Sequence, residues 1–138
     1  MDYGLWVMDY GYEINFMSER KSILKDDSYK FAITIIKLYK NLIDSKREYI
    51  LSKQILKSGT SIGAMIREAQ NAESTNDFIH KLAIAQKECD ETVYWLELLK
   101  DSDFIELNDF TRIHNDASSL LKMLKSAILT TKQKTHNP

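Results

Sequence analysis

The stretch from Leu56 to Ser74, LKSGTSIGAMIREAQNAES, decides how this chain folds, because it holds Gly59 and Gly63. A phosphate-binding P-loop needs a strand before its glycines and a Gly-Lys-Ser or Gly-Lys-Thr sequence after them. Neither is present here. Apolar and small residues instead recur at steps of three and four on both sides of the glycines, which is typical of a helix. This row consists of Leu51, Ile55, Ser58, Gly59, Ile62, Met65, Ile66 and Ala69. We therefore predict one continuous helix over residues 48–72.

Two glycines inside a helix require a compensating interaction. Each costs about 1 kcal/mol relative to alanine, and a closely packed neighbouring helix is the natural gain. We predict that Gly59, Ser61, Gly63 and Ala64 form a helix-packing flank against the next helix of the chain. The alternative is that these small residues are merely tolerated.

The rest of the chain predicts an all-α fold. The 138 residues include one proline and four glycines, too few for the frequent turns of a β fold. The same periodicity predicts helices over residues 28–42, 74–99 and 108–130, with Asp26, Asp27 and Ser28 starting the first of them. The apolar row of the first consists of Tyr29, Ile33, Ile36, Tyr39 and Ile43, with Phe31, Ile35 and Leu38 beside it. The buried row expected for the second of these three helices consists of Phe78, Leu82, Ala85, Cys89, Val93, Leu96 and Leu99. Short connections between four helices predict an antiparallel up-down-up-down bundle.

The predicted bundle spans residues 26–131, followed by a polar tail over 132–138. Residues 1–25 are expected to be an N-terminal extension. Its first sixteen residues contain five aromatic side chains without helical or strand periodicity: Tyr3, Trp6, Tyr10, Tyr12 and Phe16. We expect these sixteen residues to derive from an upstream start codon.

Motifs for catalysis or metal binding are weak. A di-iron bundle needs two Glu-x-x-His motifs, and the nearest approach is a single Asp77-x-x-His80. Cys89 lies nine residues after His80, about 13 Å along one helix, which is too far for a nucleophile and its base. We expect no enzyme, no metal and no cofactor. The lone cysteine and the lack of an apolar stretch of about 20 residues predict a cytoplasmic protein without a membrane span.

Positive charge is the more informative feature. The net charge is −1, so any nucleic-acid surface must be a local patch. The candidate phosphate contacts are Lys53, Lys57, Arg67, Lys81 and Lys87, which need to act together to displace counterions. The alternative is that these side chains are solvated or paired with nearby glutamates.

Two stretches resemble a known family, the four-helix proteins encoded in intervening sequences of bacterial large-subunit ribosomal RNA genes, also labelled S23 ribosomal proteins. LKSGTSIGAMIREAQNAES is similar to the family pattern Leu-Arg-Ser-x-Thr-Ser-Ile-x-Ala-Asn-Ile-x-Glu-Ala. DFIHKLAIAQKECDETVYWLELL is similar to its Phe-x-x-Lys-x-x-Ile-Ala-x-Lys-Glu-x-x-Glu-x-x-Tyr-Trp-Leu helix. Lys57 replaces the usual arginine and loses its planar fork, and Met65 replaces the usual asparagine.

The resemblance implies a homopentameric ring of cytoplasmic four-helix subunits. A related accessory protein of diversity-generating retroelements binds nucleic acid and its reverse transcriptase through a positively charged pentamer. We therefore expect a non-enzymatic oligomer associated with RNA or a nucleic-acid-bound protein, with Tyr94 and Trp95 at the subunit contacts. The alternative is a structural or protein-interaction module without nucleic-acid binding.

Overall fold

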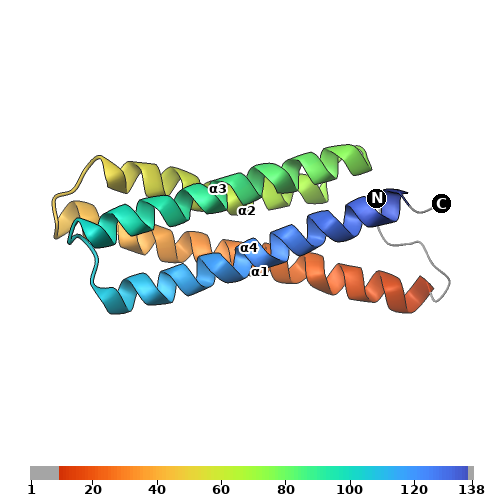
Figure 1. Ribbon diagram of the computed structural model, residues 1–138, viewed down its shortest axis with the longest axis horizontal. Helices are drawn as coiled ribbons and strands as arrows, with labels where there is room; N and C mark the ends of the chain where they lie inside the picture. The colour runs from red at the N-terminus through yellow and green to blue at the C-terminus, as the bar shows by residue number, and fades with distance from the viewer. Residues whose placement is uncertain (1–9, 137–138) are drawn as a thin grey trace.

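The chain folds into four long helices arranged as an elongated bundle (Figure 1). The computed structural model describes the backbone of residues 10–136, together with the side chains of residue 21 and residues 23–134. The helices are α1 (Tyr10–Asp44), α2 (Leu51–Gln70), α3 (Thr75–Asp101) and α4 (Leu107–His136). The all-α four-helix prediction is confirmed.

Contacts between the helices establish that neighbours run antiparallel. As the residue number rises along one helix, the number of its partner falls on the next. From α1 to α2, Ser28 lies beside Gly63 and Ile35 beside Gly59. From α2 to α3, the pairs Ser58–Thr92 and Glu68–Lys81 show the same trend. From α3 to α4, the pairs Cys89–Ala117 and Lys100–Phe110 show it again.

Each helix packs against two others, and α1 closes the arrangement by contacting α4. Among the described residues, the backbones of the diagonal pairs α1–α3 and α2–α4 do not approach each other closely. The core is formed by one apolar row from each helix, as the helical period requires. Its largest fully buried side chains are Ile35, Leu42, Ile55, Ile62, Ile66, Leu82, Leu96, Leu99, Ile113, Leu120 and Leu124.

The predicted start of the first helix was wrong. α1 begins at least eighteen residues before Ser28, at Tyr10. Ser28 is buried within the helix, where its hydroxyl donates to the backbone oxygen of Lys25 at 3.1 Å instead of capping a first turn. Leu24 continues the buried row N-terminally, and burial of its side chain favours continuation of the helix. Residues 1–9 of the predicted extension lie outside the described residues.

The flank of small residues on α2 faces a different neighbour from the one predicted. A Cβ atom on Gly59 would lie 2.8 Å from Ile35 Cγ1, and one on Gly63 would lie 3.4 Å from Ser28 Oγ, so both glycines face α1. Ser58 faces α3, with its Oγ 2.9 Å from Thr92 Oγ1. The small residues therefore let α2 fit closely between two helices, with the glycines on one side and a buried hydroxyl pair on the other.

A carboxylate organises the connection between α1 and α2. Glu48 accepts hydrogen bonds from the backbone N–H groups of Ile50, Leu51 and Ser52, at 3.2, 3.1 and 2.7 Å. These are donors that the helix itself leaves unpaired at its first turn. The negative charge also opposes the positive end of the helix dipole. Arg47, with φ 53°, supplies the left-handed turn that brings Glu48 back over α2.

Replacing Glu48 by alanine is expected to lower the free energy of unfolding by about 0.5–2 kcal/mol, the range measured for lost helix caps. Urea denaturation would measure this change. Glu97→Ala is a suitable control because Glu97 is exposed and forms no ion pair among the described residues. A loss for Glu48→Ala no larger than for Glu97→Ala would show that the cap does not stabilise α2.

Candidate nucleic-acid interface

Three of the five predicted phosphate contacts lie on the outer side of α2. Lys53, Lys57 and Arg67 are exposed, and the buried row of α2 lies on the opposite side of the helix. Lys53 and Lys57 are one helical turn apart, whereas Arg67 lies about 15 Å farther along the axis. No carboxylate among the described residues lies within ion-pair distance of any of the three. They form an extended row and not a compact cluster.

Lys81, the fourth predicted contact, is paired within the protein. Its Nζ donates to Glu68 Oε1 at 3.1 Å, which joins α3 to α2. The hydrogen bond and the negative charge of Glu68 raise the pKa of Lys81. A phosphate would have to compete with this carboxylate, so Lys81 is a weaker candidate than the lysines of α2.

Lys87, the fifth predicted contact, is exposed on α3 next to Glu88. Burial raises the pKa of Glu88 above its ordinary value, and the charge of Glu91 raises it further, while Lys57 and Lys87 act in the opposite direction. Lys57 is therefore close enough to Glu88 for its charge to be partly offset. The structure brings Lys57 and the glutamates of α3 into one mixed-charge surface between α2 and α3.

A shallow hollow lies between α1 and α2. Its volume is about 330 Å³, and its lining combines small side chains with charged ones at the edge: Lys25, Ser28, Tyr29, Ala32, Thr60, Gly63, Ala64, Arg67 and Glu68. Ala64 is exposed here, and Ser61 is half-buried with its hydroxyl donating to the backbone oxygen of Lys57 at 2.7 Å. Within the predicted flank, Gly59 and Gly63 have close neighbours on α1.

The predicted subunit contacts, Tyr94 and Trp95, lie next to each other on the outer part of α3. Their ring centroids are 5.0 Å apart in an edge-on arrangement. Tyr94 is 53% exposed, whereas Trp95 is half-buried against the core. The indole N–H of Trp95 is shielded from solvent and has no acceptor among the described residues. This pair presents an aromatic surface to any molecule that covers α3.

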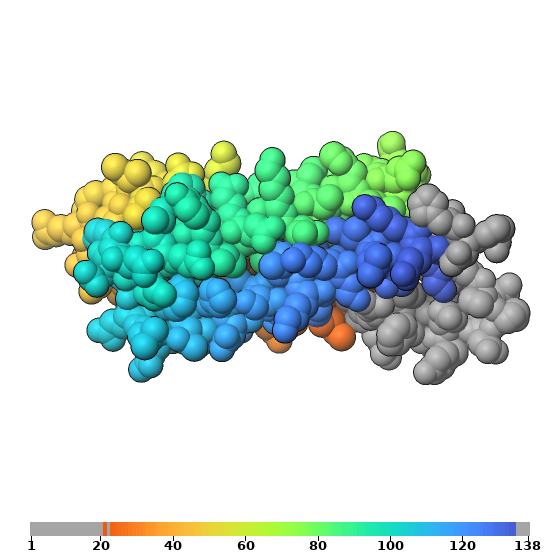
Figure 2. Space-filling view, in the orientation of Figure 1, coloured from red at the N-terminus to blue at the C-terminus, as the bar shows by residue number. Residues whose placement is uncertain are grey.

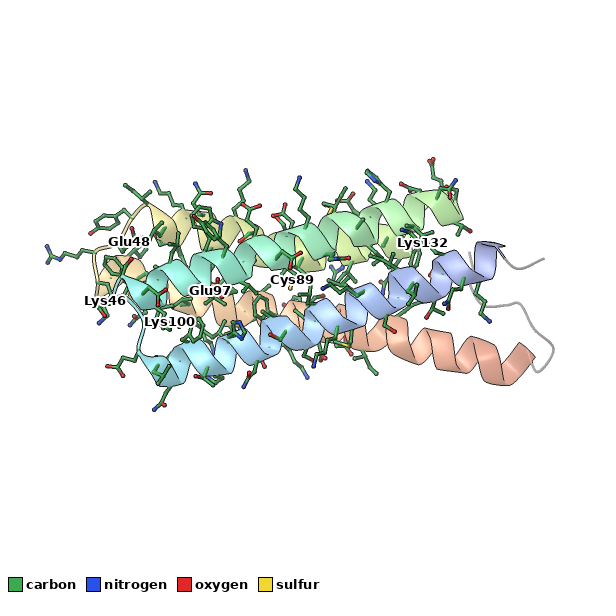
Figure 3. The ribbon with its side chains drawn as sticks, in the orientation of Figure 1. Lys46, Glu48, Cys89, Glu97, Lys100 and Lys132 are labelled. Carbon is green, nitrogen blue, oxygen red and sulfur yellow. The ribbon has the colours of Figure 1, made fainter. Side chains whose placement is uncertain are left out.

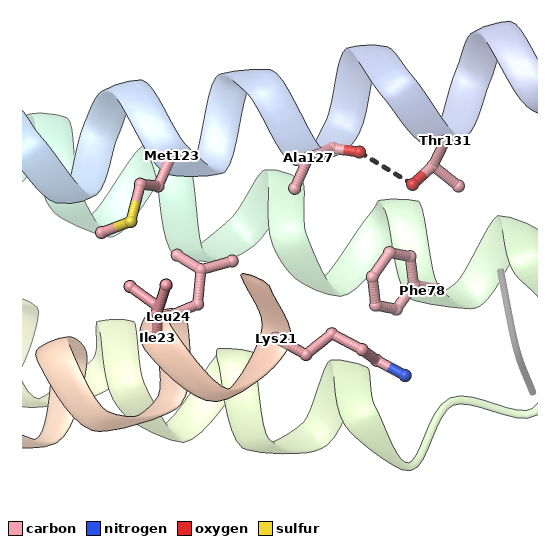
Figure 4. A pocket seen from close by; sticks show the side chains of 7 residues that line it. All are labelled: Lys21, Ile23, Leu24, Phe78, Met123, Ala127 and Thr131. Atoms are coloured by element: carbon pink, nitrogen blue, oxygen red, sulfur yellow. Dashed lines mark hydrogen bonds between the residues drawn. The ribbon is translucent and has the colours of Figure 1, made fainter. Parts of the chain in front are cut away.

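Figure 4 shows an apolar pocket at the end of the bundle where α1, α3 and α4 meet. The pocket has a volume of about 240 Å³ and is lined by Lys21, Ile23, Leu24, Phe78, Met123, Ala127 and Thr131. The hydroxyl of Thr131 donates to the backbone oxygen of Ala127 at 2.7 Å. The side chains of Figure 4 can enclose an apolar group, but they do not pair a nucleophile with a base.

Cys89 is buried at the centre of the bundle (Figure 3). Its thiol donates to the backbone oxygen of Ala117 on α4 at 3.3 Å. Burial, followed by the charge of Asp90, raises the pKa of Cys89 to about 12. A thiol of this kind is a poor nucleophile because only the thiolate reacts.

Two further properties of the described residues bear on function. They contain no group of three His, Cys, Asp or Glu side chains that could hold a metal ion. None of their helices has both the length and the apolarity to cross a membrane.

Sequence reasoning missed the polar contacts that fix the register between helices. Thr92 is fully buried in the position of α3 that the apolar pattern assigned to Val93, and its hydroxyl lies 2.9 Å from Ser58 Oγ and 2.8 Å from the Glu88 backbone oxygen. Gln70 donates to the backbone oxygen of Lys21 on α1 at 3.2 Å. The three-residue step from Cys89 to Thr92 was the available signal, but the apolar Val93 next to it obscured this step.

Comparison with known proteins agrees with this architecture. A crystal structure of a protein of unknown function from the S23 ribosomal protein family of Bacteroides thetaiotaomicron is 50% identical, with a TM-score of 0.78, and the match covers 79% of this chain and 97% of that one. No curated protein matches. The family described as 23S rRNA-intervening sequence protein matches residues 20–126, and neither description names an enzymatic activity. The chain therefore belongs to the 23S rRNA-intervening sequence protein family.

Proposed function

We propose that this protein is a non-enzymatic, cytoplasmic homo-oligomer that associates with RNA or with a ribonucleoprotein. The observation that carries the proposal is the row of exposed cations on α2, which has no ion-pair partner among the described residues. Lysine and arginine side chains that are not held by carboxylates can exchange their counterions for phosphates, which is the main source of sequence-independent affinity for nucleic acid.

Oligomerisation would strengthen such a weak surface. The net charge of −1 gives a single subunit little overall attraction for RNA. A ring of identical subunits, such as the pentamer implied by the resemblance, repeats each local row and places several rows within reach of one RNA molecule. Tyr94 and Trp95 are the proposed subunit contacts because aromatic side chains with one exposed edge are enriched at interfaces.

The alternative function is a protein-interaction module without nucleic-acid binding. It is favoured by the Lys81–Glu68 ion pair and by the position of Glu88 near Lys57 and Lys87. In this case the cations would mainly complement the protein's own carboxylates.

Binding of a fluorescently labelled RNA hairpin at increasing salt would distinguish the two functions. For phosphate contacts, the affinity is expected to fall by about tenfold or more between roughly 50 and 200 mM salt. Light scattering comes first, because a monomeric protein would remove the repeated surface. An intact oligomer without detectable RNA binding at low salt would favour the protein-interaction module.

A further inference from the structure

Charge is divided between the two halves of the α3–α4 pair. Residues 75–87 and 117–134 together contain six lysines and one acid, Asp77 in the first turn of α3. Residues 88–116, which form the rest of α3, the connection and the start of α4, contain nine acidic residues and two basic ones. The sequence boundaries between these segments are at residues 87/88 and 116/117.

The structure places the two boundaries at the same level of the bundle. The hydrogen bond from Cys89 to the backbone oxygen of Ala117 joins α3 to α4 immediately next to both boundaries. Because the two helices run antiparallel, all six lysines lie on one side of this level and all nine acids on the other. Figure 3 follows this division from Glu97 in the acidic half, past Cys89, to Lys132 at the far end of the basic half.

Three lysines of the basic half are well placed to meet a partner. Lys87, Lys122 and Lys125 are exposed, and none lies within ion-pair distance of a carboxylate among the described residues. Lys122 and Lys125 lie on the same outer side of α4, since they are three residues apart and the buried Leu120 and Leu124 face the core. Figure 2 shows α3 and α4 side by side on the viewed face of the molecule, with this half of the pair toward the right.

We infer that Lys87, Lys122 and Lys125 form the main RNA-contacting surface of the protein, named here the α3–α4 basic surface. The inference rests on the proposed function and makes it specific. Glu88 offsets part of the charge of Lys57 on α2 and of Lys87 on α3, and Glu68 holds Lys81. Lys122 and Lys125 on α4 lie in a segment without any acid, so they are the strongest cations of this surface. The basic half contains one carboxylate of its own, Asp77 at the start of α3, and none in residues 117–134 of α4. The acidic half repels phosphate, and so confines an RNA backbone to the basic end of the pair.

The test compares three double variants of the full chain. Lys122→Gln/Lys125→Gln removes two charges from the α3–α4 basic surface, and Lys53→Gln/Lys57→Gln removes two from α2. Lys37→Gln/Lys40→Gln is the matched control, because these lysines are exposed on α1 with the same three-residue spacing. Glutamine keeps the helix propensity of lysine. Thermal unfolding and light scattering would check that each variant keeps its fold and its oligomeric state.

Fluorescence anisotropy with a labelled RNA hairpin is the readout. The Lys122/Lys125 variant is expected to bind about 20-fold more weakly near 0.1 M salt, and the salt dependence of log K should become shallower by about 1.5. The Lys37/Lys40 variant should bind within about twofold of the unmodified protein, and the Lys53/Lys57 variant should lie between the two.

Three results would overturn the inference. The first is a larger loss of RNA affinity in the Lys53/Lys57 variant than in the Lys122/Lys125 variant. This result would leave the proposed function, RNA binding by the protein, intact. The second is conversion of the Lys122/Lys125 variant to a smaller oligomer, which would make the surface a subunit interface. The third is an unmodified protein that binds phosphatidylserine vesicles but no RNA, and this result alone would also reject the proposed function.

Discussion

Gly59→Leu is expected to lower the free energy of unfolding by about 3 kcal/mol, the upper part of the usual range for overpacked cores. Even the first added atom has no room, because a Cβ at this position would lie 2.8 and 2.9 Å from the Cγ1 and Cγ2 atoms of Ile35. Ile35 is fully buried, and its β-branched side chain cannot rotate away easily. The helices α1 and α2 would have to separate. Chemical denaturation followed by circular dichroism would measure the change.

Gly63→Ala is the matched control for this prediction. A Cβ at Gly63 would lie 3.4 Å from Ser28 Oγ and 3.5 Å from the Ser28 backbone oxygen, which a small adjustment can accommodate. Alanine also gains about 1 kcal/mol of helix propensity over glycine. We therefore expect the stability to be unchanged or slightly higher. Unchanged stability of Gly59→Leu would contradict the close packing of α2 against α1.

The second large effect is expected at alkaline pH and arises from Cys89. Burial raises the pKa of its thiol to about 12 in the folded protein, whereas an unfolded chain ionises this group near 8.5. Between these values the unfolded state has lost the proton that the folded state keeps. The free energy of unfolding therefore falls as the pH rises, by up to about 1.4 kcal/mol per pH unit. Below about pH 8 the full contribution is present.

Cys89→Ala isolates this contribution from the other groups that titrate at alkaline pH. The difference in unfolding free energy between the unmodified protein and Cys89→Ala should shrink by about 2–3 kcal/mol between roughly pH 9 and 11. The same burial predicts that a thiol reagent modifies Cys89 only after unfolding. A constant difference across this pH range would mean that the thiolate is tolerated in the folded core.

The periodic pattern predicted the fold class and most of the core of α2, α3 and α4, because their buried rows consist of apolar and small residues at helical steps. It was less informative for α1, where apolar residues occur on both sides of the helix. Tyr29 and Ile33 belong to the row read from the sequence, yet they are 60% and 39% exposed, and the buried row contains Phe31, Ile35 and Leu38. When a helix is apolar on two sides, spacing alone does not select the side that faces the core.

The electrostatic environment of the candidate cations depends on the register between helices, which a single sequence does not supply. Lys81 and Glu68 are thirteen residues apart, and only the antiparallel packing of α2 on α3 brings them within 3.1 Å. The lysines of α4 show the reverse case. No aspartate or glutamate follows Asp116 in the sequence, but the meaning of this for the surface depends on the contact of Cys89 with Ala117 across the bundle.

The pattern of neighbours within the bundle also has a consequence for how the protein forms. Three of the four helix pairs that pack together are consecutive in the chain, and only the α1–α4 contact joins distant segments. Such a topology has a low contact order, so the entropic cost of closing long loops arises almost entirely at one step. We therefore expect rapid folding, with the α1–α4 contact carrying the largest loop-closure cost.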